Sequence, residues 1–238
     1  MTASRGLPNV ARWLAGLFLL TALGLPAPAG RADDFDVDLA LVLAIDCSFS
    51  VDAHEFQLQM QGMAQAFMRP EVKKAIASGH RRRIAVAVIE WSDAGNEKTV
   101  VPWTIIGGAA DADEFGRIVM STGRDLAQGG TSVSTALIYA SALFSSAPSA
   151  ERRTIDISSD GRNNSGPPVS PVRDRVVAQG ITINALTILN EWPTLDIYYD
   201  RNVAGGPDYF VMPADDYQAY GDAIYRKLLR EITSPGIS

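Results

Sequence analysis

Three nearly unbroken apolar runs constrain the fold of this chain more than any other feature. They cover residues 37–45 (VDLALVLAI), 84–91 (IAVAVIEW) and 181–189 (ITINALTIL). A strand with one face in water alternates polar and apolar residues, whereas a strand buried on both faces is apolar almost throughout. We therefore predict that these runs are strands of a parallel sheet, because parallel sheets bury both of their faces.

Segments with helical patterning separate the apolar runs. In residues 53–68 the apolar positions recur with the period of one helix face. Asp52 and Glu55 have the spacing of a capping box at the start of this helix, and Pro70 is expected to end or kink it. Residues 195–201 are ambiguous. The further predicted helices cover residues 111–122, 132–145, 169–179 and 215–232.

Three more strands are predicted at residues 98–106, 153–159 and 209–212. Pro102 lies inside the first of them, and proline is tolerated at a sheet edge because it cannot donate to a neighbouring strand. We therefore place residues 98–106 at the edge of the sheet, in antiparallel orientation. Strands that alternate with helices over about 200 residues predict an α/β fold with a mainly parallel sheet.

The N-terminus has the pattern of a secretory signal peptide. Arg5 and Arg12 precede an apolar run of roughly 13 residues, which ends in small residues and prolines. A membrane-spanning helix needs about 20 apolar residues. We expect residues 1–32 to be the signal, cleaved after Ala29 or Ala32, and residues 33–238 to form one domain. An uncleaved N-terminal anchor is the alternative.

Charge and cysteine content limit the location and the partners. After Ala32 the chain has 18 basic and 27 acidic residues, a net charge of −9. Nucleic-acid binding requires a basic face, so this class of partner is not expected. The single cysteine, Cys47, excludes an intramolecular disulfide. An exported domain without disulfides, and with no second apolar stretch of membrane-spanning length, is expected in a bacterial periplasm or in the secreted fraction.

Three short oxygen-rich segments follow strands or precede helices, and we interpret them as one site. The first contains Asp46, Ser48 and Ser50, which point the same way in an extended chain. The second contains Thr131, and the third contains Asp160. In open α/β sheets, ligands bind at the carboxyl ends of the strands, where these segments are expected to meet. Two carboxylates, three hydroxyls and water suit Mg²⁺, whereas zinc is typically held by histidine and cysteine.

At this point the chain resembles a von Willebrand factor A (vWA) domain with a metal-ion-dependent adhesion site (MIDAS). The pattern of that family is Asp-x-Ser-x-Ser after the first strand, a later Thr, and an Asp after the fourth strand, which Asp46, Ser48, Ser50, Thr131 and Asp160 match. The resemblance covers about residues 37–232 and looks closest to an exported bacterial branch of the superfamily, without an assigned function. Ser159 stands where family members often have Thr.

The resemblance implies a Rossmann-like fold, with a central, mostly parallel sheet and helices on both faces. It also implies Mg²⁺ or Mn²⁺ held by the five matched residues, and a protein partner, one of whose acidic residues completes the metal shell. The expected function is thus an exported binding module and not an enzyme. Two alternatives are a metal-dependent hydrolase that uses the same ion, and a degenerate, metal-free interaction domain.

Several residues near these motifs allow more than one interpretation. Cys47 is expected to be buried and inert, because a catalytic thiol needs a nearby base and a lowered pKa. The segment 91–93 either borders the site or anchors a loop. Asn163 and Asn164 either contact a ligand or shape a turn. An aromatic group in the C-terminal third is either a binding surface or local packing; it comprises Trp192, Tyr198 and Tyr199.

Overall fold

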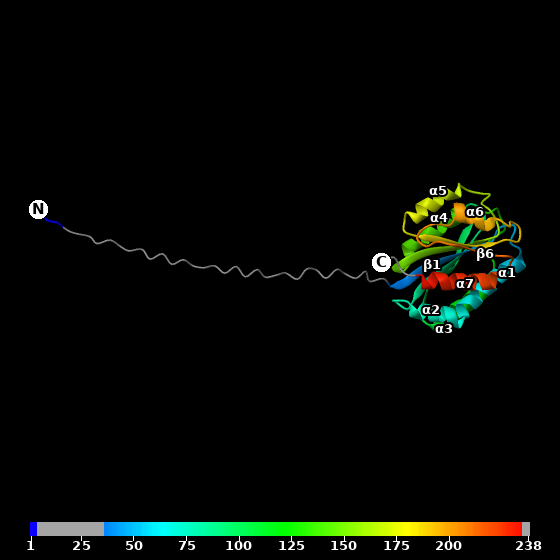
Figure 1. Cartoon of the computed structure of the whole chain (residues 1–238), viewed down its shortest axis with the longest axis horizontal. Helices are drawn as coiled ribbons and strands as arrows, with labels where there is room; N and C mark the ends of the chain where they lie inside the picture. The colour runs from blue at the N-terminus through cyan, green and yellow to red at the C-terminus, as the bar shows by residue number, and fades with distance from the viewer. Residues whose placement is uncertain (4–35, 235–238) are drawn as a thin grey trace. The chain divides into compact units, whose positions relative to one another are not determined.

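The computed structural model describes residues 1–3 and 36–234. Residues 36–234 form a sheet with helices packed on both of its faces (Figure 1). The strands are β1 (Val37–Asp46), β2 (Ile84–Trp91), β3 (Glu97–Ile106), β4 (Ala150–Ser159), β5 (Thr182–Ile188) and β6 (Val211–Ala214). The helices are α1 (Ala53–Met68), α2 (Pro70–Ser78), α3 (Ala109–Ser121), α4 (Val133–Leu143), the 3₁₀ turn η1 (Phe144–Ser146), α5 (Val169–Val177), α6 (Leu195–Asn202) and α7 (Tyr220–Thr233).

The sheet has the strand order β3-β2-β1-β4-β5-β6. All neighbouring strands are parallel except β2 and β3. This confirms the predicted mostly parallel sheet with one antiparallel edge strand. The register between β2 and β3 shifts between Val86 and Val88, opposite the stretch of β3 that contains Pro102. Proline has no backbone N–H to donate, but β3 has a neighbouring strand on one side only, so this position is tolerated at the sheet edge.

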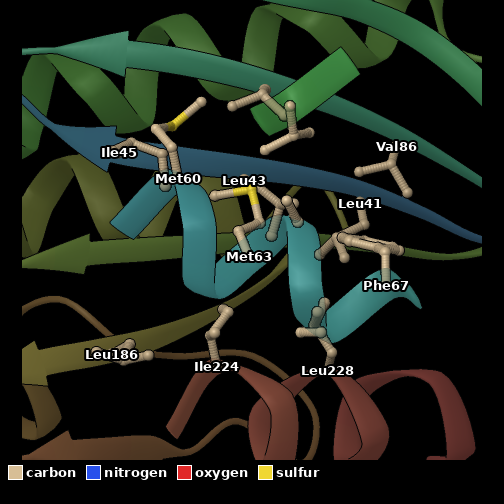
Figure 2. Packing of buried hydrophobic residues seen from close by; sticks show 14 of the residues in the cluster. Leu41, Leu43, Ile45, Met60, Met63, Phe67, Val86, Leu186, Ile224 and Leu228 are labelled. Atoms are coloured by element: carbon tan, nitrogen blue, oxygen red, sulfur yellow. The ribbon is translucent and has the colours of Figure 1, made fainter. Parts of the chain in front are cut away.

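The helices divide into two layers. Helices α1, α2, α3 and α7 cover one face of the sheet, and α4, α5 and α6 cover the other (Figure 1). Alternate residues of β1 enter the two layers: Leu41, Leu43 and Ile45 pack against α1 and α7 (Figure 2), whereas Val42 and Ala44 belong to the opposite core. A strand buried on both faces is apolar at nearly every position, as the sequence of β1 indicated.

Several elements differ from the sequence-based expectation, and β4 begins at Ala150, three residues before its predicted start. Pro70 was expected to end or kink the helix 53–68, which does end at Met68, but Pro70 also occupies the first position of helix α2, which was not predicted. The strand expected at residues 209–212 lies at Val211–Ala214 and includes Pro213, which an edge strand tolerates. The last helix begins at Tyr220 and not at Asp215. Residues 195–201, which were ambiguous, lie in α6.

The predicted signal peptide falls almost entirely outside the described residues. In the described part of the chain, every helix is too short or too polar to cross a membrane.

Candidate functional site

The site lies at the carboxyl ends of β1 and β4, which are neighbours in the sheet. Asp46 is the last residue of β1, and Asp160 directly follows β4. The register pairs Ile45 with Ser158, so the two carboxylates leave the sheet side by side. The chain connects β1 to β2 on one side and β4 to β5 on the other, and ligands of open α/β sheets bind where the strand order reverses in this way.

Asp46 is fully buried and held from two directions. Its Oδ1 accepts a hydrogen bond from the backbone N–H of Ser48 at 2.7 Å, and its Oδ2 accepts one from the hydroxyl of Ser159 at 2.5 Å. The first bond tightens the turn that follows β1, and the second ties this turn to β4. The carboxylate therefore has a fixed orientation relative to both strands.

The hydroxyls of the first motif connect it to Asp160. Ser50 donates a hydrogen bond to Oδ1 of Asp160 at 2.7 Å, and the hydroxyls of Ser48 and Ser50 lie 3.2 Å apart. Phe49, between them, points away and is 70% exposed. The predicted alternation is thus present, with the two serines directed toward the site and Phe49 directed outward.

Thr131 reaches the same place from the loop that precedes α4. Its backbone N–H donates to Oδ1 of Asn164 at 2.8 Å, and its carbonyl accepts from the backbone N–H of Asn164 at 2.9 Å. A Cβ on Gly161 would lie 3.3 Å from the hydroxyl of Thr131, so the glycine after Asp160 permits this close approach. The structure thus brings together all five residues that the sequence proposed as metal ligands.

The two aspartates form a concentration of buried negative charge. Burial, and next the charge of Asp160, raise the pKa of Asp46 to about 7, although the hydrogen bonds from Ser159 and Ser48 oppose this shift. Burial likewise raises the pKa of Asp160, against the hydrogen bond from Ser50. Two adjacent buried carboxylates are costly without a positive partner, and a bound divalent cation would supply one.

One atom of the site lacks a hydrogen-bond partner. Oδ2 of Asp160 is buried and accepts no hydrogen bond of normal geometry; the buried hydroxyl of Tyr217 lies close enough to this carboxylate to lower its pKa, but makes no hydrogen bond of normal geometry either. A buried carboxylate oxygen without a donor is uncommon. The donor set of carboxylates and hydroxyls, together with this free oxygen, fits a hard cation such as Mg²⁺.

A different type of metal centre finds no support. The described residues contain no group of three or more His, Cys, Asp or Glu side chains that could hold a metal. The site has two carboxylates, and its remaining oxygen atoms come from serine and threonine. Cys47 is buried in the core, and burial raises the pKa of its thiol well above the ordinary range, so that it stays protonated at neutral pH.

The supporting roles of three residues were not predicted from the sequence. Ser159 orients Asp46, the hydroxyl of Tyr199 donates to the carbonyl of Gly161 at 3.1 Å, and Arg124 donates to the carbonyls of Cys47 and Val51. Each of them makes a hydrogen bond to a segment that is distant in the sequence. The only sequence feature that pointed to such a role was the position of Ser159 directly before Asp160.

The structure shows the contacts of the residues for which the sequence allowed two interpretations. Asn164 holds Thr131, and Oδ1 of Asn163 accepts from the backbone N–H of Ser134 at 3.1 Å, so both asparagines shape the loops. Trp91 is buried in the core and anchors its loop. The aromatic group divides, because Tyr199 is buried whereas Trp192 is 45% exposed.

Comparison with known families identifies the chain. Residues 36–236 match the family described as "Protein of unknown function (DUF1194)". This chain belongs to the DUF1194 family. A comparison of the DUF1194 chain with curated proteins found no match.

Solved structures show that the DUF1194 chain has a vWA-like fold. Proximal thread matrix protein 1 from the mussel byssus, in a structure described as having a zinc-occupied MIDAS motif, matches 84% of the chain with a TM-score of 0.61 and 15% identity. The chain covers 49% of that protein. A von Willebrand factor type A protein from Catenulispora acidiphila matches 82% of the chain, with a TM-score of 0.56 and 19% identity, over 43% of its own length.

A third similar structure is the pilus adhesin SpaC from Lactobacillus rhamnosus GG, which matches 83% of the chain with a TM-score of 0.57 and 14% identity. The DUF1194 chain covers 30% of SpaC and about half or less of the other two proteins. At these identities the likeness establishes the fold. The resemblance to vWA domains that the sequence indicated is therefore confirmed.

Proposed function

We propose that this chain is an exported binding module, which engages a protein partner through a divalent cation held by its MIDAS-like residues. The residues that would hold the cation are Asp46, Ser48, Ser50, Thr131 and Asp160. The cation would supply an open coordination position for an acidic side chain of the partner. The observation that carries the proposal is the pair of adjacent buried carboxylates, Asp46 and Asp160, one of whose oxygens accepts no hydrogen bond of normal geometry.

The chemistry of the five residues favours binding of an anionic group. Three of the five are neutral hydroxyls, so only Asp46 and Asp160 offset the double charge of the cation. Where an aspartate reaches the cation through a water molecule instead of binding it directly, the cation keeps residual positive charge and an exchangeable position that attract a further carboxylate. The residues of the chain hold the ion, and the partner contributes the remaining ligand.

The similar structures support a role in protein interaction and export. SpaC is described as a pilus adhesin, and proximal thread matrix protein 1 comes from the mussel byssus. Both names refer to surface or extracellular material. They agree with the export that the sequence predicted from residues 1–32 and with a bacterial periplasmic or secreted location.

The ion proposed is Mg²⁺ or Mn²⁺, on the preference of hard cations for oxygen ligands. Zinc belongs in the same test, because the MIDAS motif of the mussel protein is described as occupied by zinc. The sequence-based argument against zinc rested on the absence of histidine and cysteine ligands. The preference of this chain among the three ions is a matter for direct titration.

We further propose that the site performs no catalysis. The one thiol of the chain is buried and protonated, and the hydroxyls of Ser48 and Ser50 contact each other and Asp160, a carboxylate that the cation would occupy. A hydrolase that uses the same cation is the second hypothesis. Turnover of phosphate or carboxylate esters that requires both Mg²⁺ and Asp46 would support it.

The test of the binding module compares the full chain with its Asp46→Ala variant. Both are immobilised and exposed to envelope proteins of the source bacterium in Mg²⁺, and bound proteins are released with EDTA. We expect at least one protein that the wild type captures and the variant does not. The captured protein, once purified, should bind the wild type only with the cation. If the same proteins are captured in the presence of EDTA and by the Asp46→Ala variant, the result would instead support a metal-free interaction domain.

A further inference from the structure

We propose that Arg162, Phe49 and Trp192 form a specificity surface beside the metal site, and that this surface selects a partner segment with a second carboxylate and an adjacent apolar side chain. The inference rests on the proposed function, in which a first carboxylate completes the metal shell. It names the chemistry of the partner, which the five metal-site residues do not determine.

Arg162 is held at the edge of the site by aromatic rings. Its guanidinium lies 4.9 Å from the ring centre of Trp192 and 5.4 Å from that of Tyr198, and one nitrogen donates to the hydroxyl of Thr194 at 3.1 Å. Arg162 follows Asp160 and Gly161 directly. The stacking fixes the plane of the guanidinium, so less conformational freedom is lost when an anion binds.

The positive charge of Arg162 has no carboxylate partner within the described part of the chain. No ion pair joins it to Asp or Glu, although nine other ion pairs are resolved there, and its Nε is buried without a hydrogen-bond partner. Arginine binds carboxylates through two parallel N–H donors. Because Arg162 is held in place beside the cation site without a counter-ion, we infer that it binds a second anionic group of the partner.

Two exposed aromatic residues lie at the same pocket. Phe49 and Trp192 are 70% and 45% exposed, and both line an open pocket of about 380 Å³ together with Ser50, Thr131 and Arg162. Phe49 lies between two proposed metal ligands, and its backbone N–H donates to the carbonyl of Gly129 at 2.9 Å. Large apolar groups that are exposed next to a polar centre are typical of the core of a binding surface.

The combination determines the chemistry of the occupant. A cation and an arginine in one pocket repel basic segments and attract acidic ones, although the chain as a whole is acidic. Glu191 also lines the pocket and opposes this attraction. The occupant that satisfies all of these groups is an acidic protein loop, in which one carboxylate reaches the metal, another pairs with Arg162, and an apolar side chain contacts Phe49 and Trp192.

The test uses displayed loops of 12 random residues, selected on the full chain in Mg²⁺ and eluted with EDTA. The selection is repeated on Arg162→Met, which keeps an apolar side chain for stacking but removes the charge, and on Phe49→Ser. We expect loops from the wild type to contain two acidic residues and a neighbouring apolar residue. Loops from Arg162→Met should keep one acidic residue and lose the preference for the second.

The affinities of the wild type and of each variant are then measured with synthetic peptides that have the sequences of the selected loops. Their affinity should fall about tenfold or more in Arg162→Met, because a hydrogen-bonded ionic contact is lost, and less in Arg162→Lys, which keeps the charge. Glu191→Gln, a matched control at the same pocket, should keep or increase the affinity. Folding of every variant is checked by its unchanged binding of Mg²⁺ alone.

The outcomes separate the two proposals. Loops that require Mg²⁺ and Asp46 but carry a single acidic residue, with equal affinity for wild type and Arg162→Met, would overturn the specificity surface and leave the metal-dependent module intact. An absence of EDTA-eluted loops from the wild type, or their equal recovery from Asp46→Ala, would contradict the module and with it the surface.

Discussion

At the residue scale, the orientation of Asp46 depends on a serine of another strand. Ser159 donates to Oδ2 of Asp46 at 2.5 Å and also accepts from the backbone N–H of Gly161 at 3.1 Å. It therefore links both carboxylate-bearing segments of the site. A group that orients a metal ligand typically changes metal affinity by about 10- to 100-fold when it is removed.

We predict that Ser159→Ala folds normally and binds Mg²⁺ about 10- to 100-fold more weakly than the wild type. Isothermal titration measures the change. Ser158→Ala is the matched control, because the hydroxyl of Ser158 lies 3.3 Å from that of Tyr220 and contacts neither aspartate of the site. Equal Mg²⁺ affinities for the two alanine variants would show that Ser159 has no orienting role.

The proposed metal ligands could be predicted from the sequence more completely than the residues that contact them. Asp46, Ser48 and Ser50 are close in sequence and follow a recognisable strand, and Asp160 follows another, so their spacing was informative. Tyr217 lies within the helix that was predicted over residues 215–232. It is buried, but it lies in the turn before α7, and its hydroxyl acts on Asp160. Such a contact depends on the conformation of a loop, which cannot be predicted from the spacing of apolar residues.

At the element scale, α7 is attached to the sheet by buried charges. The ammonium of Lys227 lies 2.8 Å from Asp156 on β4 and 2.6 Å from Glu231, one turn further along α7. The amide of Asn184 on β5 donates to the same Glu231 at 2.8 Å. One positive and two negative groups share this space, and burial with the charge of Glu231 raises the pKa of Asp156 to about 7.

This shift predicts a pH dependence of stability. Because the folded pKa of Asp156 is higher than its ordinary value of 3.8, the folded state binds more protons than the unfolded state between about pH 4 and pH 7. The stability from this group is complete at low pH and is lost as the pH rises through about 7. We expect Asp156→Asn, which cannot ionise, to lose less stability than the wild type over this range.

Urea unfolding in EDTA, from pH 5 to pH 8, measures this difference. EDTA removes any contribution from bound cations at Asp46. The difference in free energy of unfolding, wild type minus Asp156→Asn, should become more negative as the pH increases. Parallel profiles for the two proteins would contradict a raised pKa at Asp156.

Helices α1 and α7 meet at a pair of glycines, which gives a second prediction at this scale. A Cβ on Gly62 would lie 2.9 Å from the Cα of Gly221, whereas a Cβ on Gly221 would lie 3.6 Å from the Cα of Gly62. Gly62→Ala should therefore destabilise the fold by about 1–3 kcal/mol through overpacking.

Gly221→Ala, the matched control, should be neutral or stabilising by up to about 1 kcal/mol, since alanine has the higher helix propensity. Thermal unfolding compares the two variants with the wild type. A Gly62→Ala variant as stable as the wild type would contradict overpacking at this contact.

The elements themselves were largely predictable, and the exceptions have physical reasons. Strands β1, β2 and β5 lie in the core and are mostly apolar, so the sequence indicates them clearly. The helix 53–68 ends before Pro70 as expected, but the same proline also begins α2, and the edge strand β6 extends past Pro213. The acidic pair before α7 resembled a helix start, but Asp216 accepts from the backbone N–H of Ala219 in a turn that precedes the helix.

At the scale of the whole molecule, the sheet topology brings distant segments to one site. The order β2-β1-β4-β5 places the ends of β1 and β4 together and leaves the loops before α4 and after β5 to surround them. A bound cation would connect segments from three parts of the chain. Its binding energy therefore adds to the stability of the entire domain.

We predict that a cation concentration of 100 times the dissociation constant stabilises the fold by about 2.7 kcal/mol. For a domain of this size, this corresponds to an increase of roughly 5–10 °C in the unfolding midpoint. Calorimetry with Mg²⁺, Mn²⁺ and EDTA measures the midpoint. The increase should be absent in Asp160→Ala, and the same increase in that variant would place the bound ion elsewhere.

The most direct test of the account is isothermal titration of the full chain with Mg²⁺ and Mn²⁺, with Asp46→Ala alongside. The account predicts saturable binding at a single site in the wild type and none in the variant. The absence of saturable binding by the wild type, or equal binding by the two proteins, would contradict a cation held by Asp46, Ser48, Ser50, Thr131 and Asp160.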